Sequence, residues 1–85
     1  LQAFQTIPGV GVKIAEDFWS IGLRSISDLK NKDPQEIYDR ICRFQNAKVD
    51  RCMLYVARCA VYYASNKKHD PKLLKWWKWK DVRPK

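Results

Sequence analysis

The chain has 85 residues, and one this short buries only roughly 60–65% of its unfolded surface, so we expect one domain without a large enzyme core. Seventeen Lys and Arg oppose nine Asp and Glu, giving a formal net charge of +8 that favours anionic partners. A hydrophobic content of 46% with three Gly and four Pro excludes a disordered or low-complexity chain. No segment reaches the ~20 apolar residues of a membrane span, so we expect a soluble domain without a membrane partner.

The three cysteines, Cys42, Cys52 and Cys59, are odd in number and widely spaced. Small secreted scaffolds carry even, dense sets, so we expect a reducing, cytoplasmic compartment. These cysteines could join His69 at a metal, but no C-x-x-C or C-x-x-H spacing supports that reading. We expect buried hydrophobic cysteines, no metal and no other cofactor. The chain begins at Leu1 inside a helical pattern, so we expect further residues upstream.

Apolar spacing and capping residues predict an all-α fold of five to six helices with no strand. A short first helix ends at the turn of residues 8–11. A second helix of about three turns ends at Gly22, because glycine accepts the left-handed conformation that follows a last helical turn. A capping box of Ser25 and Asp28 then opens a third, short helix.

The second half of the chain carries the stronger helix signals. Asp33 is predicted as an N-cap, followed by Pro34 at the first helical position, where a missing N–H costs nothing. A long helix from residue 48 or 49 to about residue 65 is apolar on nearly every side, so we expect it at the centre of the fold. A last short helix is predicted over residues 70–77.

The turn between the first two helices is the most informative part of the sequence. Gly9 and Gly11 allow a sharp change of direction and the close approach of a ligand to the backbone. Their N–H groups lie at a helix N-terminus, which favours an anion, and Lys13 adds a full positive charge. Ala15 is small enough for the two helices to pack closely. The candidate phosphate-binding residues are Gly9, Val10, Gly11 and Lys13.

This stretch resembles the helix-hairpin-helix family, whose pattern joins an apolar residue, a Gly-apolar-Gly turn, an alanine and a downstream Asp-Leu. The matching residues are Ile7, Gly9, Val10, Gly11, Ala15, Asp28 and Leu29. The resemblance implies that the backbone N–H groups of Gly9 and Gly11 bind a DNA backbone phosphate without reading base sequence. It places Lys13 at a position that is often basic in the family.

The family often pairs two hairpins, and residues 44–52 can be laid on the first motif with Asn46 and Lys48 in place of the two glycines. Asparagine tolerates positive φ, but lysine does not suit close backbone approach. We therefore expect a degenerate second hairpin that keeps the fold and contributes the Lys48 and Arg51 side chains. Together the two hairpins imply a SAM-like domain over residues 1–66.

The whole chain is similar to a small bacterial family of helix-hairpin-helix proteins that is named for a pathogenicity locus and for mitomycin resistance. The similarity lies in residues 7–15, in residues 49–52 with 58–64, and in residues 74–81. It covers almost the full length and implies the same fold.

Residues 67–85 form a separate basic segment, which we expect to pack on the same domain. Its net charge of +6 leaves only +2 for residues 1–66. Trp76, Trp77 and Trp79 alternate with lysines, and aromatic rings beside cations suit stacking on bases. We expect Trp77 to pack inward and the other two tryptophans to be the better contact residues. The candidate secondary DNA contacts are Lys48, Arg51, Lys75, Trp76, Lys78, Trp79 and Lys80.

No catalytic constellation converges, because the sequence lacks a Ser-His-Asp set and the Lys-Ser/Thr of a P-loop. We expect a protein without enzyme activity that binds DNA with little sequence preference, in DNA repair or processing. The alternative is a protein-interaction or dimerisation module, with a second copy or a repair protein as partner, in which the hairpin is only structural. An exposed patch of Leu54, Tyr55, Val61 and Tyr62 would favour that alternative.

Overall fold

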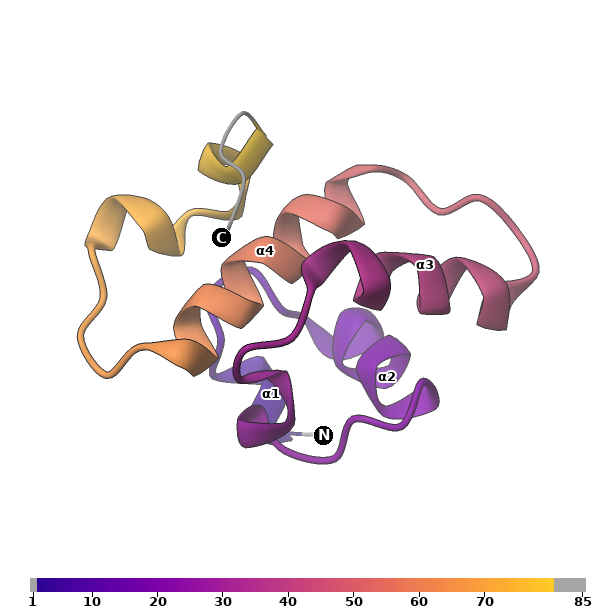
Figure 1. Cartoon of the computed structure of the whole chain (residues 1–85), viewed down its shortest axis with the longest axis horizontal. Coiled ribbons are helices and arrows are strands. Elements are labelled where there is room, and N and C mark those ends of the chain that lie inside the picture. The colour runs from indigo at the N-terminus through magenta and orange to yellow at the C-terminus, as the bar shows by residue number, and fades with distance from the viewer. Residues whose placement is uncertain (1, 81–85) are drawn as a thin grey trace.

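A computed structural model describes residues 2–80, and within them the chain is helical with no strand (Figure 1). The α-helices are α1 (Gln2–Gln5), α2 (Val12–Ser20), α3 (Pro34–Gln45) and α4 (Cys52–Ser65). The 3₁₀-helices are η1 (Ile26–Leu29), η2 (Pro71–Leu74) and η3 (Trp76–Lys80). The all-helical prediction is confirmed, but residues 2–80 hold four α-helices where five to six helices are predicted, because the short segments after α2 and after α4 form 3₁₀ turns. Leu1 of the predicted first helix and residues 81–85 of the basic segment lie outside the described residues.

The helix boundaries that rest on local capping agree with the sequence. The Asp33 side chain accepts a hydrogen bond from the Gln35 N–H at 3.0 Å and caps α3. Ser25 and Asp28 form the predicted capping box at η1. Gly22 follows α2 with a φ of +100°, as a left-handed residue after a last turn should.

The long helix begins later than expected, at Cys52 rather than at residue 48 or 49. The Asp50 carboxylate accepts a hydrogen bond from the Cys52 N–H at 2.8 Å, and this bond lowers the pKa of Asp50. The preceding helix α3 ends at Gln45, and its C-cap Asn46 has a left-handed φ of +52°. Residues 46–51 are therefore a connection and not a helical turn.

Helix α4 is the centre of the fold, as predicted. Its buried residues are Met53, Leu54, Val56, Ala57, Cys59, Ala60 and Val61. Helices α3, η1, η2 and η3 all pack on it, and Figure 1 shows α4 running through the middle of the molecule. Helices α1 and α2 meet through Phe4 and Phe18, whose rings pack edge to face with centroids 5.5 Å apart. None of the described helices has the length and apolar character needed to cross a membrane.

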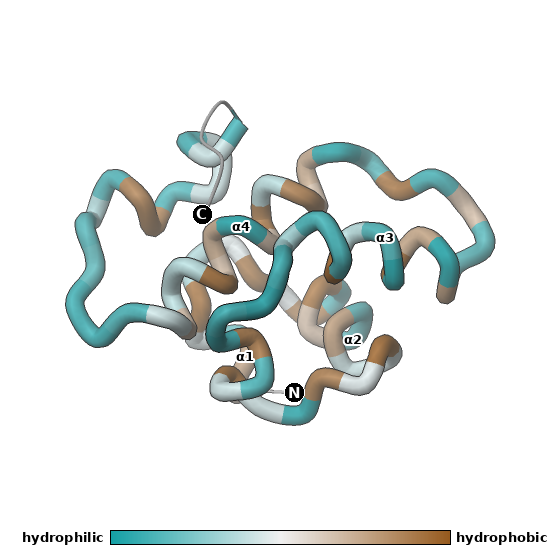
Figure 2. Tube along the Cα trace, viewed as in Figure 1, coloured by the Kyte–Doolittle hydropathy of each residue, from teal (hydrophilic) through white to brown (hydrophobic). Residues whose placement is uncertain are grey.

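The segment after α4 folds back onto it, following a connection over residues 66–70 that is hydrophilic along its whole length (Figure 2). Trp79 is only 4% exposed, and its indole N–H donates to the Leu73 carbonyl at 2.7 Å. Trp77 is 54% exposed. The predicted orientation of these two tryptophans is therefore wrong. A 3₁₀-helix has three residues per turn, so Trp79 shares the inner face of η3 with Trp76 and leaves Trp77 outside.

Candidate nucleic-acid interface

The two glycines of the turn between α1 and α2 differ in backbone conformation and in surroundings. Gly9 has a φ of +87°, and a Cβ at this position would lie 2.8 Å from Cδ1 of Trp76. Gly11 is the N-cap of α2, with a φ of −92° that any residue can adopt, and a Cβ there would meet no atom within 4 Å. Gly9 is thus needed for the turn and for the packing of Trp76, whereas Gly11 leaves the approach to the backbone open.

Free backbone donors gather at this turn and continue into the first turn of α2. Among residues 2–80, the N–H groups of Gly9, Gly11 and Val12 have no hydrogen-bond acceptor. The Val10 N–H donates instead to the Ile7 carbonyl at 3.1 Å. This bond corrects the predicted ligand set, because the Val10 amide is already occupied inside the turn. The remaining donors lie at the positive end of the nine-residue helix α2, where an anion is stabilised.

A shallow hollow of about 310 Å³ lies beside this turn, and Gly9, Lys13 and Trp76 are among the residues that line it. The Lys13 side chain is exposed, whereas Trp76 is half-buried against the core. Met53 and Val56 of α4 contribute apolar lining. The turn therefore combines free backbone donors, one cation and one aromatic ring on a surface that α4 supports.

Arg51, Trp76, Trp77 and Lys80 surround a second hollow of about 310 Å³. Because Trp76 lines both hollows, the two adjoin. Trp77 lines this hollow, although the sequence predicts it as a core residue. The three-residue period of a 3₁₀-helix would have placed it outside.

The remaining predicted DNA contacts lie outside the two hollows or in the core. Lys48 is exposed in the connection between α3 and α4 and lines neither of these two hollows. Lys75 and Lys78 are exposed on the C-terminal segment but also line neither. Trp79 is buried, and Arg58 of α4 donates to its carbonyl at 2.7 Å. A base cannot stack on an indole in that position, so Trp79 is a core residue.

The cysteines occupy three different environments. Cys59 is fully buried below the turn, and burial raises the pKa of its thiol to about 11. Cys42 is half-buried and Cys52 is exposed, so the prediction of buried cysteines is wrong for Cys52. His69 stacks on Tyr63 with ring centroids 4.6 Å apart. No three His, Cys, Asp or Glu side chains of residues 2–80 lie together as metal ligands would.

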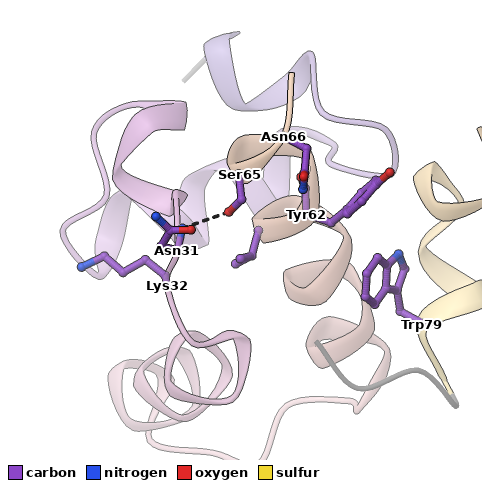
Figure 3. Close-up of a pocket in the computed structure, with 7 residues that line it drawn as sticks. Asn31, Lys32, Tyr62, Ser65, Asn66 and Trp79 are labelled. Atoms are coloured by element: carbon purple, nitrogen blue, oxygen red, sulfur yellow. Dashed lines mark hydrogen bonds between the residues drawn. The ribbon is translucent and has the colours of Figure 1, made fainter. Parts of the chain in front are cut away.

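A separate pocket of about 270 Å³ lies where the end of α4 meets the connection between η1 and α3 (Figure 3). The Ser65 hydroxyl accepts a hydrogen bond from the Asn31 N–H at 2.9 Å. The Asn66 side chain donates to the Tyr62 carbonyl, also at 2.9 Å, and Trp79 forms part of the wall. The first bond ties α4 to the neighbouring connection, and the second closes the end of α4. Trp79 is the single predicted site residue that lines the pocket.

The patch that would favour a protein-interaction module does not form. Leu54 and Val61 are 1% and 7% exposed, because α4 is covered from several sides. Tyr55 and Tyr62 are half-buried. The four side chains that the alternative requires on the surface are therefore part of the core or its border.

These features define a small, basic, all-helical domain with an open glycine turn. Residues 1–85 match the model of the family described as Pathogenicity locus, and the chain belongs to that bacterial family. It is similar to the mitomycin resistance protein McrB of Streptomyces lavendulae, with 32% identity over 72 residues. The match covers 85% of this chain and 65% of that protein. No solved structure matches the chain. The predicted membership of the pathogenicity-locus family is confirmed.

Proposed function

We propose that this protein binds DNA through backbone phosphates at the turn between α1 and α2. The observation that carries the proposal is the group of free N–H donors that includes Gly9, Gly11 and Val12, beside open space at Gly11. Phosphate oxygens accept hydrogen bonds from such donors, and the dipole of α2 adds to the attraction. Because a phosphate is the same at every base pair, the binding has little sequence preference.

The proposal includes the finer architecture. Helices α1 and α2 form a helix-hairpin-helix, and α3 and α4 form a degenerate second hairpin in a SAM-like arrangement. The motif of residues 7–15 supports the first hairpin. Asn46 supports the second, because it has a positive φ at the position that corresponds to Gly9. The second hairpin then offers the exposed Lys48 and Arg51 side chains in place of free amides.

The role that we propose is that of a binding protein without catalysis in DNA repair or processing, and it rests on the helix-hairpin-helix resemblance. Three free cysteines support a reducing, cytoplasmic location. The exposed cations Lys13, Arg51 and Lys80 lie beside the two hollows and can neutralise phosphates on either side of the turn.

A salt titration tests this proposal. Anisotropy measures the association constant for a fluorescently labelled duplex. The logarithm of that constant should fall with the logarithm of the salt concentration at a slope of about −3.6 if about four phosphates are neutralised. Lys13→Ala should reduce the magnitude of this salt slope by about 1. Lys30 is an exposed lysine outside the site, so Lys30→Ala should leave the slope unchanged. Absence of binding at low salt, or equal effects of the two substitutions, would contradict the proposal.

A further inference from the structure

Trp77 is the most exposed tryptophan in the described part of the chain, and no cation lies over its ring. It is 54% exposed, and its contact with Trp76 is edge to face, with centroids 5.8 Å apart. Trp19 is also exposed, at 42%, but the Arg24 guanidinium lies over its ring at 4.1 Å. An exposed indole face is available for stacking by another flat group.

The surroundings of Trp77 carry positive charge. Arg51 and Lys80 line the same hollow, and both side chains are exposed. The hollow also contains the carboxylate of Asp50, which is engaged as the cap of the Cys52 N–H. Two cations against one carboxylate leave the hollow positive. An aromatic face between cations is the arrangement that proteins use to bind the bases and the backbone of a nucleic-acid strand together.

Trp77 is also close to the proposed phosphate site. Trp76 packs directly on Gly9, and the Trp77 ring contacts Trp76. One indole therefore separates the free ring of Trp77 from the glycine turn. A strand whose phosphate lies on the turn can bring a neighbouring base to Trp77 only if that base is free to leave its stack.

That condition selects the form of DNA. Inside a duplex, each base is covered on both faces by its neighbours, and exposing one face costs unpairing and unstacking energy. An aromatic side chain stacks readily on bases of single strands, loops and ends. A stacking residue beside a phosphate site thus has a function on unpaired DNA and none on an intact duplex.

We propose that Trp77 stacks on an unpaired base next to the phosphate held at the turn, so that the substrate class is DNA with a single-stranded segment. This inference rests on the proposed function, because the turn must first bind a phosphate. It adds the structure of the DNA, which the backbone N–H groups do not distinguish.

The test compares three labelled duplexes in fluorescence anisotropy: one with blunt ends, one with a short thymidine overhang, and one with an overhang of the same length built from abasic nucleotides. The last two carry the same phosphates and differ only in the bases. The thymidine overhang should bind roughly tenfold more tightly than the abasic overhang, as expected for one stacked base. Trp77→Ala should abolish that difference, and Trp77→Phe should retain part of it.

Trp19→Ala is the matched control, because it removes an exposed tryptophan away from the turn and should leave the preference intact. Circular dichroism checks that each variant is folded. Equal affinity for the two overhangs, or a preference that survives Trp77→Ala, would overturn this inference while leaving salt-dependent duplex binding in place. A change in molar mass by light scattering on Trp77→Ala, without loss of the preference, would assign Trp77 to self-association instead. Failure of all three DNAs to bind would remove the proposed function as well.

Discussion

Gly9 and Gly11 lie in the same turn, but their roles can be separated by substitution. A side chain at Gly9 must adopt a positive φ and displace Trp76, whereas one at Gly11 meets neither problem. The first glycine serves the fold, and under the proposed function the second serves the approach of a phosphate. The helix-hairpin-helix pattern that the sequence resembles does not distinguish the two, because it records only that both positions are glycine.

We therefore expect opposite effects from two alanine substitutions. Gly9→Ala should lower the free energy of unfolding by about 1–2 kcal/mol, because a left-handed alanine is strained. Gly11→Ala should change it by less than about 0.5 kcal/mol but weaken duplex binding roughly tenfold, because the methyl group obstructs the N–H groups. Urea unfolding and anisotropy measure the two quantities. A Gly11→Ala protein that is unstable but binds normally would contradict this division.

Cys59 predicts a pH dependence of stability. Its Sγ lies below the turn, 4.0 Å from the Pro8 carbonyl and 3.6 Å from the Leu73 carbonyl. Burial raises the pKa of this thiol to about 11 from an ordinary value of 9.0, so the folded protein holds the proton more tightly than the unfolded chain does. The free energy of unfolding should therefore decrease as the pH rises from about 9 to about 11.

The matched variant is Cys59→Ala, which has no thiol to ionise. Urea unfolding at several pH values between 8 and 11 should show a smaller decrease for Cys59→Ala than for the original protein. Parallel curves for the two proteins would show that folding does not raise the pKa of the Cys59 thiol.

At the scale of elements, the sequence predicted those helix ends that depend on a few neighbouring residues. Asp33, the Ser25–Asp28 pair and Gly22 act through bonds or conformations within their own turn, so a local pattern suffices. The start of α4 was misplaced because Val49 is apolar and fits the helical stripe. Its carbonyl instead accepts a hydrogen bond from the Tyr38 hydroxyl of α3, a contact across eleven positions that no local pattern reports.

In the candidate site, too, the features set by neighbouring residues could be predicted and those set by distant contacts could not. The glycine turn and Lys13 could be identified from spacing, but the internal bond of Val10 depends on the observed turn geometry. The packing of Trp76 on Gly9 joins residues from opposite ends of the chain. The orientation of Trp77 and Trp79 required knowing that η3 is a 3₁₀-helix, since an α-helical period distributes the three tryptophans differently.

The orientation of η3 on α4 leads to a prediction about stability. Trp79→Ala should lower the free energy of unfolding by about 3–5 kcal/mol, because it empties a buried site and removes a bond to the Leu73 carbonyl. Trp77→Ala should change it by less than about 0.5 kcal/mol, because that ring is largely in solvent. Thermal or urea unfolding of the two variants measures the difference. Similar losses in both would mean that η3 packs on α4 in another register.

At the scale of the whole molecule, charge and motif occupy different parts of the chain. Residues 1–66, which carry the glycine turn, have a net charge of only +2, while residues 67–85 carry +6. The fold brings the two parts together through Trp76, which packs on Gly9, and through Lys80, which lies by Arg51. Under the proposed function, the turn supplies donors of fixed geometry and the C-terminal segment supplies most of the long-range attraction.

Neutralising lysines on the C-terminal segment should therefore weaken low-salt binding more than a change at the turn does. Replacing Lys75, Lys78 and Lys80 with Gln keeps Trp79 in place and should reduce the steepness of the salt dependence by about 2 to 3. Lys13→Ala should reduce it by only about 1. If Lys13→Ala has the larger effect in low salt, the charge of the segment is incidental to binding.

The central claim is that backbone N–H groups of the turn hold a phosphate, and an NMR titration tests it most directly. In ¹H–¹⁵N spectra of labelled protein, addition of duplex DNA should shift the amide signals of Gly9, Gly11 and Val12 downfield. The Val10 signal should move less, since its N–H already donates to Ile7. Shifts confined to the lysines of the C-terminal segment, with the signals of the turn unchanged, would contradict the claim.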